Sequence, residues 1–277
     1  MKMCEVGKES DGQSVKLYFE DVGHGRPVVL IHGWPVSQAM WEHQIFALAS
    51  AGCRVISYDR RGFGRSSKPW TGYHYDTFAD DLKALLDHLD LQDVTLVGFS
   101  MGGGEVARYM ARHHGNRVSQ VAFVSAVTPC LLKSKENPEG VDKDVFDDMK
   151  ANICKDRPAF LQDFGKKFFG VSAIHHPVSQ ATLEWQQFLA LPASLKATLD
   201  CVDAFGMTDF RKDLSSIQVP TLVIHGTDDK IVPSEASGRL TAKMVQGAAF
   251  REYDGAPHGL FITHKDQLNA DLISFVR

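Results

Sequence analysis

The feature that most constrains this chain is a serine between two glycines, placed where a strand pattern gives way to a helix pattern. Residues 94–97 are apolar and mostly β-branched, which predicts a buried strand. Residues 98–102 read Gly-Phe-Ser-Met-Gly, and residues 103–112 have a helical pattern. In this order G-x-S-x-G indicates a sharp turn that holds the Ser100 hydroxyl above a helix N-terminus, which favours developing negative charge. The alternative is a turn whose serine only caps the helix.

The rest of the chain alternates strand and helix patterns, which predicts an α/β protein with a mostly parallel sheet. Residues 1–26 predict one or two edge strands, and residues 27–31 are an unbroken apolar run typical of a central parallel strand. Further strands are predicted over 54–58, 94–97, 118–124 and 221–225, with a last strand near 250–253. Helices are expected over 40–50, from a Thr77 cap onward, and over about 265–276. Residues 130–213 lose the strand signals and are helical. We therefore expect a core of residues 1–128 and 214–277 and a helical cap of residues 129–213.

A serine nucleophile needs a base and an acid that orients the base, and the order serine, acid, histidine predicts where to look. His258 lies in a loop just after the last predicted strand, where a base is expected, although a solvated loop histidine is the alternative. The loop 226–233 follows another strand and offers Asp228 and Asp229, and position alone leaves both open. The backbone N–H groups of Met101 and of the loop 32–34, most simply that of Trp34, are the expected oxyanion donors.

Composition excludes several other classes of function. The 277 residues carry a formal net charge of −4 with scattered Lys and Arg, so neither nucleic acid nor an anionic membrane is an expected partner. The five cysteines are widely spaced without a CxxC, which indicates free thiols in a reducing compartment. The first residues contain no apolar run, so we expect no signal peptide and a cytoplasmic location. We also expect no metal site and no nucleotide site, because the required spacings are absent.

With these residues in place, the chain resembles the α/β-hydrolase-fold bacterial aryl esterases and cofactor-free (non-haem) chloroperoxidases, also called perhydrolases. The resemblance runs almost end to end. The segments that carry it are His32-Gly33-Trp34-Pro35, residues 58–66 (YDRRGFGRS), 75–81 (YDTFADD), 97–109 (VGFSMGGGEVARY), 220–233 (PTLVIHGTDDKIVP) and 256–259 (APHG).

The resemblance implies a function and chooses the acid. The catalytic aspartate of this family stands three residues after the strand-ending glycine and four before the proline, which here is Asp229. It implies that Ser100 attacks small carboxylic esters to form an acyl-enzyme, which water or hydrogen peroxide resolves without a cofactor. Family analogy further implies that the substrate pocket is lined by Trp34, Pro35, Val127, Phe164, Phe168 and Ile231.

Three alternatives stay open. An amidase of the same fold acting on a small bicyclic γ-lactam would use the same residues, and so would a lyase. A non-catalytic binding protein is the alternative from another class. Relatives are often oligomers, so a homo-oligomer is an expectation although the sequence shows no interface. Pro35 suggests a further hypothesis: by fixing the backbone it sets the direction of the Trp34 carbonyl, which would accept a hydrogen bond from peroxide.

Overall fold

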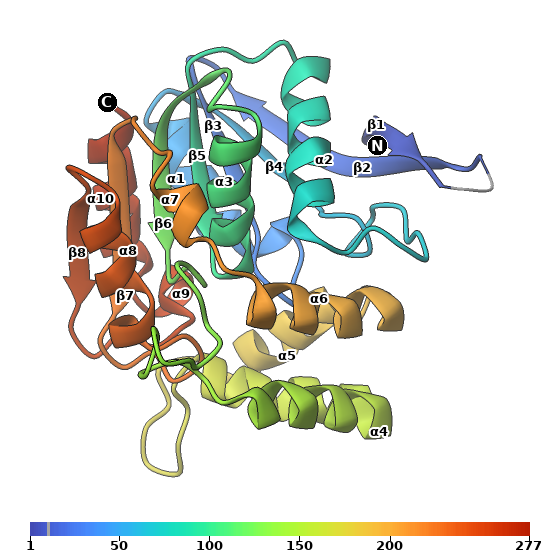
Figure 1. The fold of residues 1–277 in the computed structure, drawn as a ribbon, viewed down its shortest axis with the longest axis vertical. Coiled ribbons are helices and arrows are strands. Elements are labelled where there is room, and N and C mark those ends of the chain that lie inside the picture. Colours follow the sequence, from blue (N-terminus) through green and yellow to red (C-terminus); the bar gives the residue numbers. More distant parts are fainter. Residues whose placement is uncertain (10–11) are drawn as a thin grey trace.

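A computed structural model describes residues 1–9 and 12–277, and within them the chain forms an eight-stranded sheet (Figure 1). The spatial order is β1-β2-β4-β3-β5-β6-β7-β8, and all neighbours from β4 to β8 run parallel while β2 is antiparallel to both β1 and β4. The strands are β1 (Lys2–Lys8), β2 (Ser14–Gly23), β3 (Arg26–Ile31), β4 (Cys53–Tyr58), β5 (Val94–Phe99), β6 (Val118–Val124), β7 (Thr221–Gly226) and β8 (Ala249–Tyr253).

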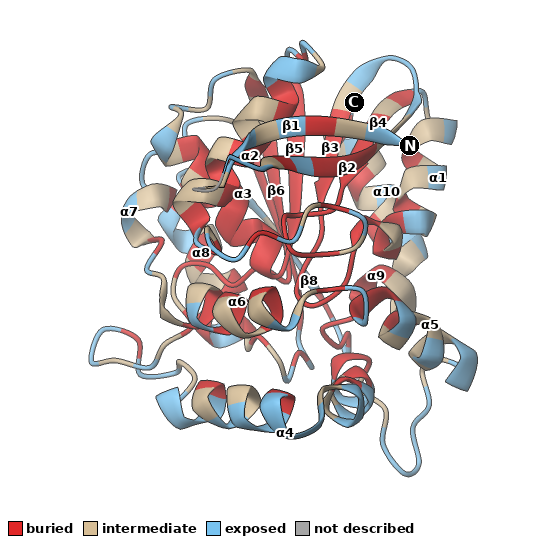
Figure 2. Cartoon of the chain, turned by 90° about the vertical axis from the view of Figure 1, so that its right-hand side faces the viewer, coloured by how far each residue is buried: buried red, intermediate tan, exposed pale blue. Residues whose placement is uncertain are grey.

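Helices cover both faces of this sheet, which explains why its central strands are apolar on both sides. One face carries α1 (Glu42–Ser50), α9 (Leu260–Thr263) and α10 (Lys265–Val276), and the other carries α2 (Tyr75–His88), α3 (Met101–Arg112), α7 (Arg211–Leu214) and α8 (Gly238–Met244) (Figures 1 and 2). Short 3₁₀ turns, η1 (Gln38–Trp41) and η2 (Ser234–Ala236), precede α1 and α8. Two buried apolar clusters form the core, one on each face. The predicted mostly parallel α/β architecture is therefore observed.

The segment between β6 and β7 forms a helical layer over one edge of the sheet (Figure 1). It contains α4 (Lys143–Phe168), α5 (Gln180–Ala190) and α6 (Leu195–Met207). Helix α4 is kinked at Asp156, whose backbone angles are φ −159° and ψ 89°, two residues before Pro158. Asp156 caps the second half of the helix, because its carboxylate accepts a hydrogen bond from the Ala159 N–H at 3.0 Å, and Pro158 removes a helical donor in the first turn that follows. The kink gives the two halves of α4 different directions over the sheet.

The predicted cap of α2 is wrong by a few residues. The helix begins at Tyr75, and the side chain of His74, not that of Thr77, occupies the capping position by accepting from the Thr77 N–H. An imidazole nitrogen supplies the acceptor that Ser, Thr or Asp supplies at most helix starts. The predicted C-terminal helix, by contrast, has the expected bounds in α10.

The topology brings distant residues to one place. In a parallel sheet the carboxyl ends of the strands lie along one edge, which is where ligands bind in such proteins. Ser100 follows β5, Asp229 follows β7 by a short loop, and His258 lies in the loop after β8. The helical layer α4–α6 covers the same edge (Figure 2).

Candidate active site

Ser100 lies at a strained turn between β5 and α3. Its φ of 54° and ψ of −119° fall in a region that residues other than glycine rarely adopt. A Cβ atom at Gly98 would lie 2.5 Å from the carbonyl oxygen of Gly102, and one at Gly102 would lie 2.5 Å from that of Ile31. Both neighbours must therefore be glycine for the backbone to close this turn, which leaves Ser100 at the start of α3.

Ser100, His258 and Asp229 form one continuous hydrogen-bonded chain. The Ser100 Oγ lies 3.0 Å from His258 Nε2, and His258 Nδ1 lies 2.7 Å from Asp229 Oδ2. If Nδ1 carries the ring proton and donates a hydrogen bond to the carboxylate, Nε2 is free to accept the serine proton. All three side chains are buried. These distances therefore allow His258 to take the proton of the Ser100 hydroxyl.

Asp229 is held in one orientation by its own loop. Its Oδ1 accepts hydrogen bonds from the backbone N–H groups of Ile231 (2.9 Å) and Val232 (2.8 Å). Burial alone would raise the pKa of Asp229, but the neighbouring His258 and His225 lower it below its ordinary value. The other aspartate that the sequence left open, Asp228, is paired with Lys230 at 2.7 Å and faces away into solvent.

The loop after β3 is fixed by a buried arginine. Arg60 donates from its backbone N–H to His32 Nε2 (2.9 Å) and from its guanidinium to the His32 carbonyl (2.9 Å) and to Glu105 of α3 (2.7 Å). Burial and the nearby Arg60 charge lower the pKa of His32 well below its ordinary value.

Within residues 1–9 and 12–277, the backbone N–H groups of Trp34 and Met101 have no hydrogen-bond acceptor. Both are therefore free to bind an oxyanion.

A cavity of about 180 Å³ opens onto Ser100 and His258. Of the predicted pocket residues, Trp34, Val127, Phe164 and Ile231 line it, together with residues that the sequence analysis missed: Leu131, Val141, Val145, Phe146, Met149, Phe160, Lys167, Phe205, Lys230 and Val232. The spacing 160, 164, 167 along α4 is a helical period that could have indicated one shared face.

Two of the predicted pocket residues do not line this cavity. Phe168 is fully buried, and its ring packs edge-on against the His258 ring with centroids 4.8 Å apart. Pro35 follows Trp34 through a cis peptide bond and is also absent from the lining. Phe168 therefore supports the histidine from behind.

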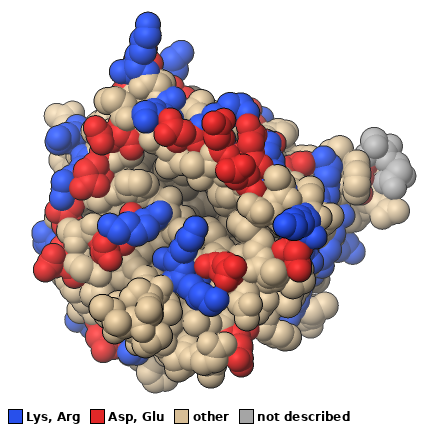
Figure 3. All heavy atoms as spheres, turned by 90° about the horizontal axis from the view of Figure 1, so that it is seen from below, with Lys and Arg blue, Asp and Glu red and all other residues tan. Residues whose placement is uncertain are grey.

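The surface over the site is hollowed and carries charges of both signs. Figure 3 shows basic and acidic side chains bordering a hollow on the side where the helical layer lies. Of the charged residues that line the cavity, Lys230 pairs with Asp228, and Lys167 has no ion-pair partner among the described residues.

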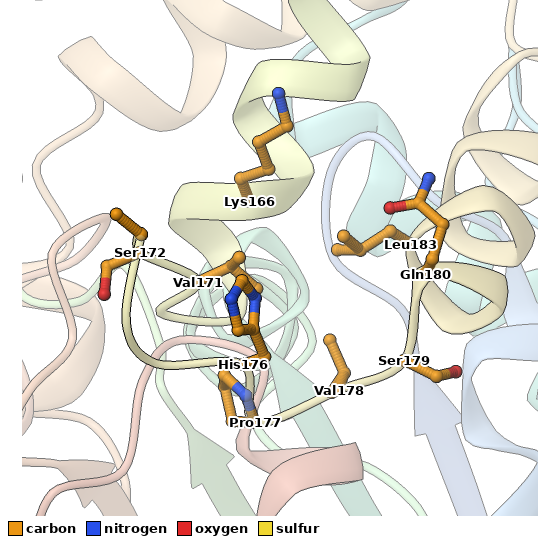
Figure 4. A pocket seen from close by; sticks show the side chains of 10 residues that line it. Lys166, Val171, Ser172, His176, Pro177, Val178, Ser179, Gln180 and Leu183 are labelled. Atoms are coloured by element: carbon orange, nitrogen blue, oxygen red, sulfur yellow. The ribbon is translucent and has the colours of Figure 1, made fainter.

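A second and larger depression lies within the helical layer, between the end of α4 and the start of α5, and is lined by Lys166, His176 and Leu183 among others (Figure 4). None of the three hydrogen-bonded residues lines it, so we assign the chemistry to the smaller cavity.

Over the described ranges, 1–9 and 12–277, no group of three His, Cys, Asp or Glu side chains is placed to hold a metal ion. The cysteines described are all free thiols. In the same part of the chain, none of the helices combines the length and apolar character needed to cross a bilayer.

Comparison with known proteins places the chain in a family. The model of the alpha/beta hydrolase fold matches residues 26–265. The chain belongs to the alpha/beta hydrolase fold family. This hydrolase is 43% identical to a non-heme chloroperoxidase of Kitasatospora aureofaciens over 95% of its own length and 96% of the relative's. It is 37% identical to a bifunctional esterase/perhydrolase of Acinetobacter calcoaceticus, covering 98% of this chain and 100% of that one.

A solved structure supports the same assignment. The hydrolase matches the crystal structure of a bromoperoxidase from Bacillus anthracis with a TM-score of 0.95 and 48% identity, over 99% of each chain. These names confirm the resemblance to non-haem chloroperoxidases and esterases that the motifs predicted, and the α/β-hydrolase fold is confirmed with it.

Proposed function

We propose that this α/β-hydrolase is a serine esterase that cleaves small carboxylic esters, including aryl esters, through an acyl-enzyme. His258 takes the proton of the Ser100 hydroxyl as the oxygen attacks the ester carbonyl, and Asp229 stabilises the imidazolium that forms. The N–H groups of Trp34 and Met101 bind the oxyanion. When the tetrahedral intermediate collapses, His258 returns the proton to the leaving alcohol, and Ser100 keeps the acyl group. The observation that carries this proposal is the unbroken chain from Ser100 Oγ through His258 to Asp229.

The second half-reaction admits two nucleophiles. His258 takes a proton from water, the hydroxide attacks the acyl group, and the carboxylic acid leaves as Ser100 regains its proton. Hydrogen peroxide in the same position yields a peracid, which then oxidises halide in solution. The names of the relatives, a bifunctional esterase/perhydrolase and a non-heme chloroperoxidase, support this second candidate. Neither route calls for a cofactor, and a cytoplasmic location remains a prediction.

The mostly apolar cavity supports small, uncharged acyl groups and aromatic alcohols. Trp34, Phe160 and Phe164 bring aromatic rings to one wall, with the Trp34 and Phe164 centroids 5.3 Å apart. Such a surface binds an aromatic ring through apolar burial and edge-to-face contact. The division into core and cap suggests that the cap, residues 129–213, determines which substrates fit.

The test compares wild type and Ser100→Ala with p-nitrophenyl acetate. Removal of the nucleophile of a working triad lowers kcat on the order of a million-fold. A fluorophosphonate probe should label the wild type covalently and leave Ser100→Ala unlabelled. Equal hydrolysis rates for the two proteins would reject the proposal and favour a binding protein on a hydrolase fold. Turnover of a γ-lactam in preference to an aryl acetate would favour the amidase alternative instead.

A further inference from the structure

A second buried histidine touches the proposed catalytic acid. His225 is the penultimate residue of β7, and its side chain and that of Asp229 are both completely buried. Its Nε2 lies 2.8 Å from the carbonyl oxygen of Val232 and 3.3 Å from Asp229 Oδ2. Asp229 Oδ2 therefore lies close to two imidazoles, those of His258 and His225.

The contacts fix the tautomer of His225. A carbonyl oxygen accepts hydrogen bonds only, so Nε2 must carry a proton and donate it to Val232. The other ring nitrogen, Nδ1, is buried and has no hydrogen-bond partner in the described structure. It lies against the backbone of α8, where a Cβ atom at Gly238 would be 2.5 Å from it. The glycine thus leaves room for the ring, and the protonated Nε2 lies 3.3 Å from the Asp229 carboxylate.

We infer that His225 is a positioning residue for the catalytic acid, which acts by holding the Asp229 carboxylate between the Nε2–H dipole on one side and His258 on the other. This inference rests on the proposed function, because it assigns Asp229 the role of orienting His258. The two backbone N–H groups already saturate Oδ1. His225 is the second imidazole beside Oδ2, so it limits how much negative charge Asp229 offers to His258.

The charged groups around His225 are few. Asp229 faces it from its own loop, and Glu252 of β8 is its partner in the strand register. Glu252 is itself paired with Arg239 of α8 at 2.7 Å. Gly238 of α8, which lies against the His225 ring, carries no charge. Asp229 is therefore the negative group that a change at His225 would affect most, because it lies 3.3 Å from the His225 ring.

The experiment measures kcat/KM for p-nitrophenyl acetate against pH in wild type, His225→Leu and His225→Gln. Without the Nε2–H dipole, Asp229 attracts the His258 proton more strongly, so a higher pH is needed to free the base. We expect His225→Leu to lower kcat/KM about tenfold and to move the acid limb of the profile to higher pH by roughly 0.5 unit. Glutamine places an N–H near the position of Nε2, so His225→Gln should keep most of the wild-type kcat/KM and most of the wild-type position of the acid limb.

Thr241→Val is the matched control. Thr241 of α8 is fully buried, as His225 is, and its hydroxyl forms a hydrogen bond with the Thr128 hydroxyl (2.9 Å), not with Asp229. It should lose stability and keep the wild-type pH profile. If His225→Leu lowers the rate with the acid limb unmoved, or if His225→Gln behaves as His225→Leu does, then His225 only ties its loop and the inference is wrong. Failure of the proposed function would appear separately, as wild-type hydrolysis by Ser100→Ala.

Discussion

Phe164 and Phe168 lie one helical turn apart at the end of α4, yet the structure gives them different tasks. Phe168 is fully buried and contacts the rings of His258, Phe99 and Phe261. Phe164 is partly buried, lines the cavity and contacts Trp34. Truncation of each to alanine should therefore perturb different properties of the enzyme.

The magnitudes follow from burial. Replacement of a fully buried phenylalanine by alanine removes its transfer free energy and leaves a cavity, so Phe168→Ala should lower the free energy of unfolding by about 3–5 kcal/mol. Phe164 is less buried and already borders a cavity, so Phe164→Ala should cost roughly 1–2 kcal/mol. The space gained at Phe164 should raise kcat/KM for a p-nitrophenyl hexanoate relative to the acetate by about tenfold, since a methylene in an apolar pocket contributes ~1–3 kcal/mol.

Two assays separate these effects. Urea unfolding curves give the change in stability, and a p-nitrophenyl acyl series from acetate to octanoate gives the chain-length preference. Phe168→Leu, which keeps most of the buried volume, serves as the milder variant if Phe168→Ala does not fold. Equal losses of stability at the two positions would refute the reasoning. So would a Phe168 variant that shifts the chain-length preference and keeps wild-type stability.

Two further predictions follow. Pro35→Leu should lower the ratio of peracid to acid formed from one ester in the presence of hydrogen peroxide, because Pro35 acts through the Trp34 carbonyl; an unchanged ratio contradicts this. Burial keeps the pKa of His32 in the native state below its value in the unfolded state. Below about pH 6.5 the unfolded state therefore binds a proton at His32 that the native state does not bind. Stability should fall by up to about 1.4 kcal/mol per pH unit as the pH drops. His32→Gln should be less stable than wild type at pH 7, but its urea midpoint should fall less steeply between pH 7 and 5. If the midpoints of the two proteins fall in parallel with pH, protonation of His32 in the unfolded state is not the cause.

Much of the fold could be predicted from the sequence because its central strands are buried on both faces. Such strands are rich in apolar residues, and the strands predicted at 27–31 and 118–124 lie in β3 and β6. The meeting of Ser100, Asp229 and His258 could be predicted for a topological reason. Each follows a parallel strand, and parallel strands end at one edge.

What the sequence did not reveal depends on side-chain direction and long-range contact. Phe164 and Phe168 have the same residue type and a helical spacing, but the kink at Asp156 sets the direction of the second half of α4. That direction presses Phe168 against His258. The ring of His74 likewise took the capping position expected for Thr77. Neither outcome follows from local preference, because each is decided by neighbours far along the chain or by one rotamer.

The segment YDRRGFGRS has a physical role that its use as a family motif does not explain. Arg60 binds both the ring and the carbonyl of His32, and its guanidinium binds Glu105, which also accepts from the Tyr58 hydroxyl. A buried ion pair contributes little net stability, because removing both charges from water costs about what their attraction returns. Its effect is geometric. Arg60 joins the loop that carries the Trp34 N–H to the helix that carries the Met101 N–H. The two N–H groups that we propose as oxyanion donors have to be fixed relative to each other to bind one oxygen.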